Sequence, residues 1–198
     1  MVTIRIYNYA AVPPAEIDTA RAVANGIFHE TGISLQWIDC AVAAALPASP
    51  ASAFAPLGAT ADKPAAPRSS CTAPLGDVEF VLRLLQLPDG DRAPHMSLGF
   101  SLVELDAHTG VLITIDPARA AAVAAQAQAD SSLVLGRAIA HEVGHLLLGT
   151  SRHAQTGLMR ALWSQRELRD NRPADWLFSV REANLMRQGL VLRNRETN

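Results

Sequence analysis

Two histidines and a glutamate share the pattern H-E-x-x-H over residues 141–145. On an α-helix, residues four apart lie on one face, so His141 and His145 project side by side and can bind one metal ion. Glu142 lies next to His141 and is placed to act as a general base. In a zinc site such a carboxylate takes a proton from a metal-bound water, whose pKa falls to about 7.

The sequence around this pattern is apolar, with Leu135, Ile139, Val143 and Leu147 at helical spacing. A helix with such flanks is buried on most sides. Two histidines and a glutamate in a buried helix carry a large desolvation penalty unless they have a partner. The context therefore favours a bound metal, one zinc ion per chain, over a chance match to a short pattern.

Length and composition narrow the possible functions. The 198 residues, 49% of them hydrophobic, suit one globular domain with a sizeable core. With a net charge of -2 and no long run of Lys or Arg, the chain lacks the positive surface that nucleic-acid binding needs. No apolar run approaches the roughly 20 residues of a membrane span.

The two cysteines, Cys40 and Cys71, border an unusual segment rich in Ala, Pro and Ser, residues 41–74. They are either two free buried thiols or a disulfide, which would imply an oxidising compartment. We expect the disulfide, and with it a secreted or cell-envelope protein whose signal peptide has been removed. The N-terminus lacks the layout of a signal peptide, so a cytoplasmic location stays open.

We interpret residues 41–74 as a long loop inserted in one domain, because the 40 residues before it are too few for a core of their own.

Hydrophobic periodicity predicts the elements that carry these residues. Apolar and polar residues alternate over residues 3–8 and 33–38, which predicts two strands. Between them, the apolar residues of 15–31 recur at helical spacing and predict a helix that ends at Gly32. Strand-helix-strand order favours a parallel pair in an α/β or α+β sheet. Further strands are predicted at residues 78–87, in a central position, and at residues 100–105 and 111–115, joined as a hairpin. His95 and His108 fall in loops and are interpreted as solvated.

Helix boundaries are marked by capping residues. Asp116 followed by Pro117 predicts a helix over residues 118–129, and Asp130 caps the metal-binding helix, which we expect to run to Leu148. Gly149 is placed for the left-handed residue that ends it. Later helices are predicted at residues 162–169 and 179–188, the last ending at Gly189.

A catalytic zinc needs three protein ligands and one open position. His153 follows Gly149 by four residues and can reach the metal if the chain turns back at the glycine. Glu167 or Glu182, on the later helices, could instead supply a carboxylate ligand. The residue types alone leave these alternatives open.

Over residues 138–159 the sequence resembles the metzincin clan of zinc metallopeptidases. The matching residues are His141, Glu142, His145, Gly149 and His153, followed by Met159, which is similar to the methionine of the clan's Met-turn. The clan's usual string is H-E-x-x-H-x-x-G-x-x-H. In this chain the glycine comes one residue later and the last histidine two residues later, as H-E-x-x-H-x-x-x-G-x-x-x-H.

The resemblance implies a zincin-like α+β fold. Its expected parts are a twisted, mostly parallel sheet with an antiparallel edge strand, a backing helix, the metal-binding helix and a small C-terminal helical subdomain. Residues 1–198 would form one catalytic domain, with an upper part at 1–149 and a lower part at 150–198. Residues 110–115 resemble the edge strand along which such enzymes bind an extended substrate.

The resemblance also implies the ligands and the reaction. His141, His145 and His153 would bind Zn²⁺, and Glu142 would act as general base in the hydrolysis of a peptide or protein substrate. Two alternatives remain: a gluzincin-like zinc hydrolase with a downstream glutamate ligand, and a non-catalytic binding module that zinc stabilises.

Overall fold

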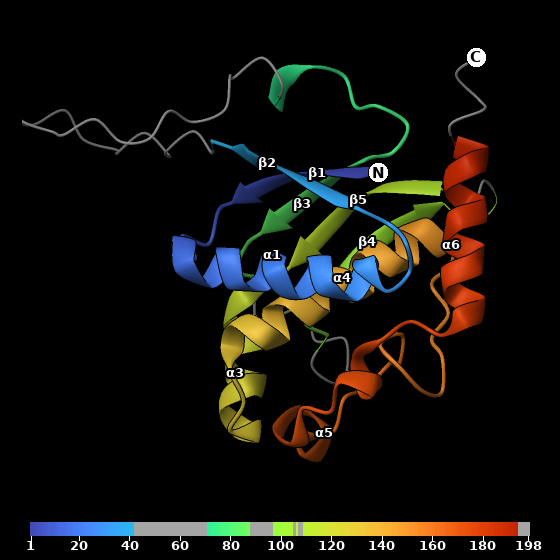
Figure 1. Ribbon diagram of the computed structural model, residues 1–198. Coiled ribbons are helices and arrows are strands. Elements are labelled where there is room, and N and C mark those ends of the chain that lie inside the picture. Colours follow the sequence, from blue (N-terminus) through green and yellow to red (C-terminus); the bar gives the residue numbers. More distant parts are fainter. Residues whose placement is uncertain (42–70, 88–96, 105, 107–108, 194–198) are drawn as a thin grey trace, which may run out of the picture.

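The computed structural model describes residues 1–41, 71–87, 97–104, 106 and 109–193, which build one five-stranded sheet with helices packed on it (Figure 1). The strand order is β2-β1-β3-β5-β4. The strands are β1 (Val2–Asn8), β2 (Leu35–Cys40), β3 (Glu79–Leu84), β4 (Gly99–Glu104) and β5 (Thr109–Ile115). The first three and β5 pair in parallel, and β4 pairs antiparallel with β5. The predicted α+β fold with a mostly parallel sheet and an antiparallel edge strand is confirmed, and β3 is central as expected.

The identity of the edge strand differs from the prediction. We expected residues 110–115 at the edge, but β5 pairs with β3 on one side and with β4 on the other. The hairpin explains the difference, because β4 comes first in the chain and β5 returns between β4 and β3. The antiparallel edge is therefore β4.

Two helices, α1 (Pro14–His29) and α4 (Ser131–Leu148), lie against one face of the sheet (Figure 1). The chain continues from β5 through α3 (Pro117–Ala127) into α4, and ends in α5 (Gln165–Asp170), a 3-10 helix (Pro173–Trp176) and α6 (Val180–Arg193). The core lies between the sheet and these helices. Its largest fully buried side chains include Ile4, Phe80, Leu82 and Ile113 from the sheet, Phe28 from α1, and Leu135, Ile139 and Leu146 from α4.

The predicted helix caps are confirmed. The carboxylate of Asp116 accepts hydrogen bonds from the first backbone N–H groups of α3, and that of Asp130 does the same for α4. At the other end, α4 runs to Leu148 and closes at Gly149, whose φ of 61° lies in the left-handed region. The boundaries of the helix with the H-E-x-x-H residues are thus set by local residues at both ends.

The prediction that the last helix ends at Gly189 is wrong, because α6 continues to Arg193. A Cβ added at Gly189 would lie 2.9 Å from the carbonyl oxygen of Leu147. The glycine therefore allows α6 to pack closely on α4. A glycine inside a helix costs about 1 kcal/mol relative to alanine, and this close packing offsets that penalty.

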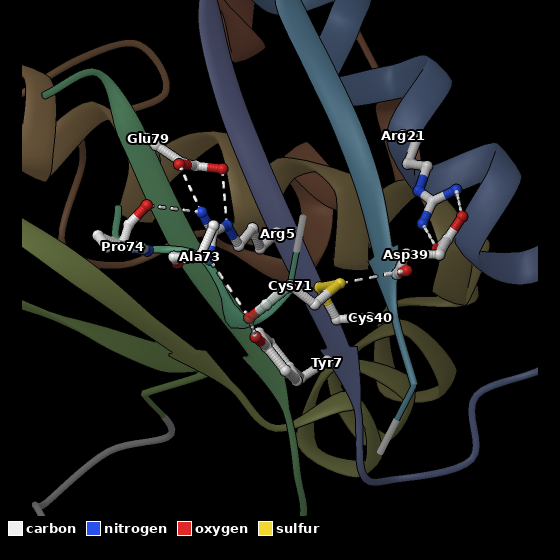
Figure 2. Close-up of a disulfide and its surroundings, with 9 residues drawn as sticks. All are labelled: Arg5, Tyr7, Arg21, Asp39, Cys40, Cys71, Ala73, Pro74 and Glu79. Carbon is white, nitrogen blue, oxygen red and sulfur yellow. Dashed lines mark hydrogen bonds and ion pairs between the residues drawn. A yellow bond between two sulfur atoms is a disulfide. The ribbon is translucent and has the colours of Figure 1, made fainter. Parts of the chain in front are cut away.

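Cys40 and Cys71 form a disulfide, as predicted, between the end of β2 and the segment that leads into β3 (Figure 2). Most of the predicted insertion at 41–74, namely residues 42–70, lies outside the described residues, as do His95 and His108. No helix in the described part of the chain is long and apolar enough to cross a membrane.

Arg5 of β1 fixes the chain where it returns from the disulfide to β3 (Figure 2). Its side chain is 5% exposed and forms an ion pair with Glu79, with Nε 2.7 Å from Oε1. It also donates hydrogen bonds to the carbonyl oxygens of Cys71, Ala73 and Pro74. One buried guanidinium thus anchors a segment with no regular pairing of its own.

This ion pair predicts a pH-dependent contribution to stability. The hydrogen bond from Arg5 lowers the pKa of Glu79 below its ordinary value of 4.5. The contribution of the pair is therefore fully present above pH 4.5 and is lost as the pH falls through the lower, folded-state pKa. Glu79→Gln should lower the free energy of unfolding by about 2 kcal/mol at pH 7, measured by urea denaturation, and the difference from the unmodified protein should shrink below pH 4.5.

Asp18→Asn is the matched control, because Asp18 is an exposed carboxylate at 75%. It should change the unfolding free energy by less than about 0.5 kcal/mol. A deficit in Glu79→Gln that stays the same from pH 7 to pH 3 would contradict the assignment to the ion pair.

Candidate metal centre

The H-E-x-x-H residues lie in the buried middle of α4. His141, Glu142 and His145 are each 8% exposed or less. The Nε2 atoms of His141 and His145 lie 3.1 Å apart. One turn of helix therefore brings the two imidazoles together, as the spacing predicts.

The other ring nitrogens fix the tautomer of both histidines. Nδ1 of His141 lies 2.9 Å from the carbonyl oxygen of Leu158, and Nδ1 of His145 lies 2.8 Å from that of Thr150. A carbonyl oxygen only accepts hydrogen bonds, so each Nδ1 carries the hydrogen and each Nε2 of the neutral ring carries a lone pair. Two lone pairs 3.1 Å apart repel each other unless a cation lies between them. The donor atoms and their orientation therefore fit a metal ion.

His153 brings a third nitrogen to the same point. Its ring centroid lies 5.3 Å from that of His141 and 4.9 Å from that of His145. One donor atom from each of the three histidines lies within 4.8 Å of the other two. Tetrahedral zinc with bonds of 2.0–2.1 Å places its nitrogen ligands roughly 3.4 Å apart, so small movements of the exposed His153 would complete the set. The structure thus brings together the three histidines that the sequence predicts as ligands.

The turn after α4 carries the chain back toward His153. The backbone N–H groups of Gly149 and Thr150 both donate to the carbonyl oxygen of His145. The carbonyl oxygen of Thr150 faces Nδ1 of the same histidine. His145 therefore holds the turn through its backbone and through its side chain.

Burial keeps the histidines neutral. The pKa of His141 is lowered to about 4, mainly by burial; the contact with the Leu158 carbonyl opposes this shift, and repulsion from any positive charge on His145 or His153 adds to it. Burial also lowers the pKa of His145 and of His153. All three shifts favour the neutral ring, which is the form that binds a metal.

Burial has the opposite effect on Glu142, because it disfavours the charged carboxylate. The pKa of Glu142 is raised to about 7, although a hydrogen bond from the hydroxyl of Ser101 favours the charged form. A carboxyl group with this pKa both accepts and releases a proton near neutral pH. Ser101 was not predicted from the sequence; it is a serine at a strand position that faces the core.

A cleft of about 350 Å³ opens over the three histidines. β4 borders it on one side, through residues that include Gly99 and Ser101, and Arg160 and Trp163 line it as well. The Glu142 carboxyl group and the three imidazoles thus face a space that a ligand can enter.

Met159 is buried against α4. A Cβ added at Gly144, inside the H-E-x-x-H pattern, would lie 2.8 Å from Sδ of Met159 and 2.7 Å from Cε1 of Phe178. Gly144 therefore gives these two side chains room to pack against the helix. The preceding residue, Leu158, supplies the carbonyl oxygen for His141 and accepts a second hydrogen bond from Nε1 of Trp163.

The two glutamates considered as alternative ligands cap helices instead. The carboxylate of Glu167 accepts hydrogen bonds from Ser164 in a capping box and forms an ion pair with Arg160. Glu182 accepts from the backbone and hydroxyl of Ser179 at 2.7 and 2.8 Å. Neither belongs to the group of potential metal ligands found among the described residues.

A scan against models of protein families found no match to this chain, and a search of curated proteins found no relative.

Gly144→Ala tests the packing beneath the metal centre. The added methyl group would overlap Met159 and Phe178, and we expect the free energy of unfolding to fall by about 1 to 3 kcal/mol. The affinity for zinc should fall as well, because the displaced segment carries the carbonyl acceptor of His141. The control is Gly26→Ala in α1, where an added Cβ has no neighbour within 4 Å. It should raise the unfolding free energy by roughly 0.5 to 1 kcal/mol, and equal effects of the two variants would contradict this account.

His153→Ala tests the third ligand. We expect a loss of zinc affinity larger than the roughly 10- to 100-fold that removal of an outer contact causes, with little loss of stability, because His153 is exposed on a loop. Competition with a chelator measures the affinity.

Glu167→Ala and Glu182→Ala are the comparison variants. Each should lower helix stability by about 1 kcal/mol through loss of a cap and leave zinc affinity unchanged. Unchanged affinity in His153→Ala, with a large loss in either glutamate variant, would establish a gluzincin-like ligand set instead.

Proposed function

We propose that this chain is a zinc-dependent metallopeptidase of the metzincin type, with His141, His145 and His153 as zinc ligands and Glu142 as general base. One observation carries the proposal. Three neutral imidazoles converge beside a buried carboxyl group whose pKa is about 7, and all four line the same cleft. Gly149 and His153 lie one and two residues later than in the clan's string, and this is compatible with the proposal because the chain still returns His153 to the other two histidines.

The number of ligands favours a catalytic metal over a structural one. Structural zinc sites are closed by four protein ligands, whereas catalytic sites have three and an open position. The group assembled from the described residues has three donors, all histidines. A carboxyl group beside them has no purpose in a structural site, which speaks against the binding-module alternative.

The chain's own residues would perform the proton transfers. A zinc ion held by the three histidines would act as a Lewis acid toward the scissile carbonyl and lower the pKa of a coordinated water. Glu142 would take the proton of the attacking water as the new C–O bond forms. It would then deliver that proton to the amide nitrogen, which leaves as an amine when the C–N bond breaks. The carbonyl groups of Leu158 and Thr150 would keep two of the imidazoles oriented throughout.

The edge strand supports a peptide as substrate. Within the described part of the chain, β4 pairs only with β5 and borders the cleft, so an extended peptide could add to its other side through main-chain hydrogen bonds. Such binding carries little sequence preference. We expected residues 110–115 to bind the substrate in this way. Because β5 is paired on both sides, we propose β4 as the substrate-binding strand instead. The disulfide supports an oxidising compartment, so we propose that the protein acts in the cell envelope or after secretion.

Glu142→Gln tests the reaction directly. It removes the general base and keeps the size of the side chain, so the rate of peptide cleavage should fall roughly 10²- to 10⁴-fold. Cleavage is measured on a library of quenched fluorescent peptides with the zinc-loaded protein, and zinc content by elemental analysis should stay at one per chain.

Glu30→Gln, an exposed change at the end of α1, is the matched control and should leave the rate unchanged. Full cleavage by Glu142→Gln would eliminate Glu142 as the base. A zinc-loaded, unmodified protein that cleaves none of the peptides would overturn the proposed function and favour the binding module.

A further inference from the structure

We infer that Ser101 of β4 is a positioning residue that holds the carboxylate of Glu142 in place for proton transfer. The inference rests on the proposed function of Glu142 as general base. It assigns a role to a strand residue that lies outside the H-E-x-x-H pattern and 41 positions away from it in the sequence.

The hydroxyl of Ser101 contacts two oxygen atoms of Glu142. The Ser101 hydroxyl is within hydrogen-bond distance of Oε2 of Glu142, and it lies 2.8 Å from the backbone carbonyl oxygen of the same residue. Ser101 pairs with Ile113, a fully buried residue, so the two side chains point to the same face of the sheet. That face is the one packed against α4. Both hydrogen-bond partners of the hydroxyl therefore belong to Glu142.

Glu142 depends on this contact. Its side chain is buried, and within the described part of the chain Ser101 provides the hydrogen bond to the carboxylate. A buried carboxylate without a hydrogen-bond partner would turn toward water. The hydroxyl opposes this by giving the carboxylate one defined position at the wall of the cleft.

Three variants test the inference: Ser101→Ala removes the hydroxyl, Ser101→Thr retains it, and Ser34→Ala removes an exposed serine elsewhere. We expect Ser101→Ala to lower kcat roughly 10- to 100-fold. KM and zinc affinity should both stay within about twofold, because neither the ligands nor the substrate contacts change. Ser101→Thr should recover most of kcat, and Ser34→Ala should match the unmodified protein.

A second readout does not require activity. In crystal structures of the metal-free proteins, the Glu142 carboxylate should leave its position in Ser101→Ala and keep it in Ser101→Thr. An unmoved carboxylate in Ser101→Ala would overturn the inference, as would an unchanged kcat, whatever the metal content. Absence of peptide cleavage by the unmodified, zinc-loaded protein would instead overturn the proposed function, and the crystal structures would still decide whether Ser101 positions Glu142.

Discussion

The structure depends on one electrostatic constraint: two imidazole lone pairs face each other 3.1 Å apart inside a buried helix. Each ring is held there because its opposite nitrogen donates to a backbone carbonyl, of Leu158 in one case and Thr150 in the other. Both acceptors come from the chain that follows α4. The C-terminal part of the protein therefore completes the site, since without it the rings would lose their tautomer and their orientation.

Close approach of the surrounding elements provides the burial that this site requires. Three glycines permit it. A Cβ at Gly136 would overlap Val23 of α1, one at Gly144 would overlap Met159 and Phe178, and one at Gly189 would press on the carbonyl of Leu147. Neighbours thus pack against α4 on several sides at backbone distance. This burial lowers the pKa of the histidines and raises that of Glu142. The close packing around α4 is therefore also the cause of the shifted pKa values.

The sequence predicts the features that local chemistry determines. The caps at Asp116 and Asp130, the left-handed Gly149, the strands and the pairing of Cys40 with Cys71 are all found as expected. The features that were missed depend on contacts between distant segments. From the sequence alone Gly189 is typical of a helix end, and its role depends on the contact with α4. No local pattern indicates that β5 lies between β4 and β3 in the sheet. The contact of Ser101 with Glu142 forms only when β4 packs against α4, because the two residues are 41 positions apart in the sequence.

Relative to the metzincin string, one extra residue precedes Gly149 and a second lies between Gly149 and His153, and the effects of the two are linked. One extra residue before Gly149 extends α4 by about 100° of rotation, which would direct the outgoing chain away from the histidines if nothing else changed. The turn offsets this, because Gly149 and Thr150 both bond to the carbonyl of His145 while the Thr150 carbonyl accepts from the ring of that histidine. The direction in which the chain leaves α4 is thus fixed by contacts with His145 rather than by the length of the helix. The extra residue between Gly149 and His153 then restores the reach of the loop, so two single-residue shifts compensate and the three nitrogens still meet.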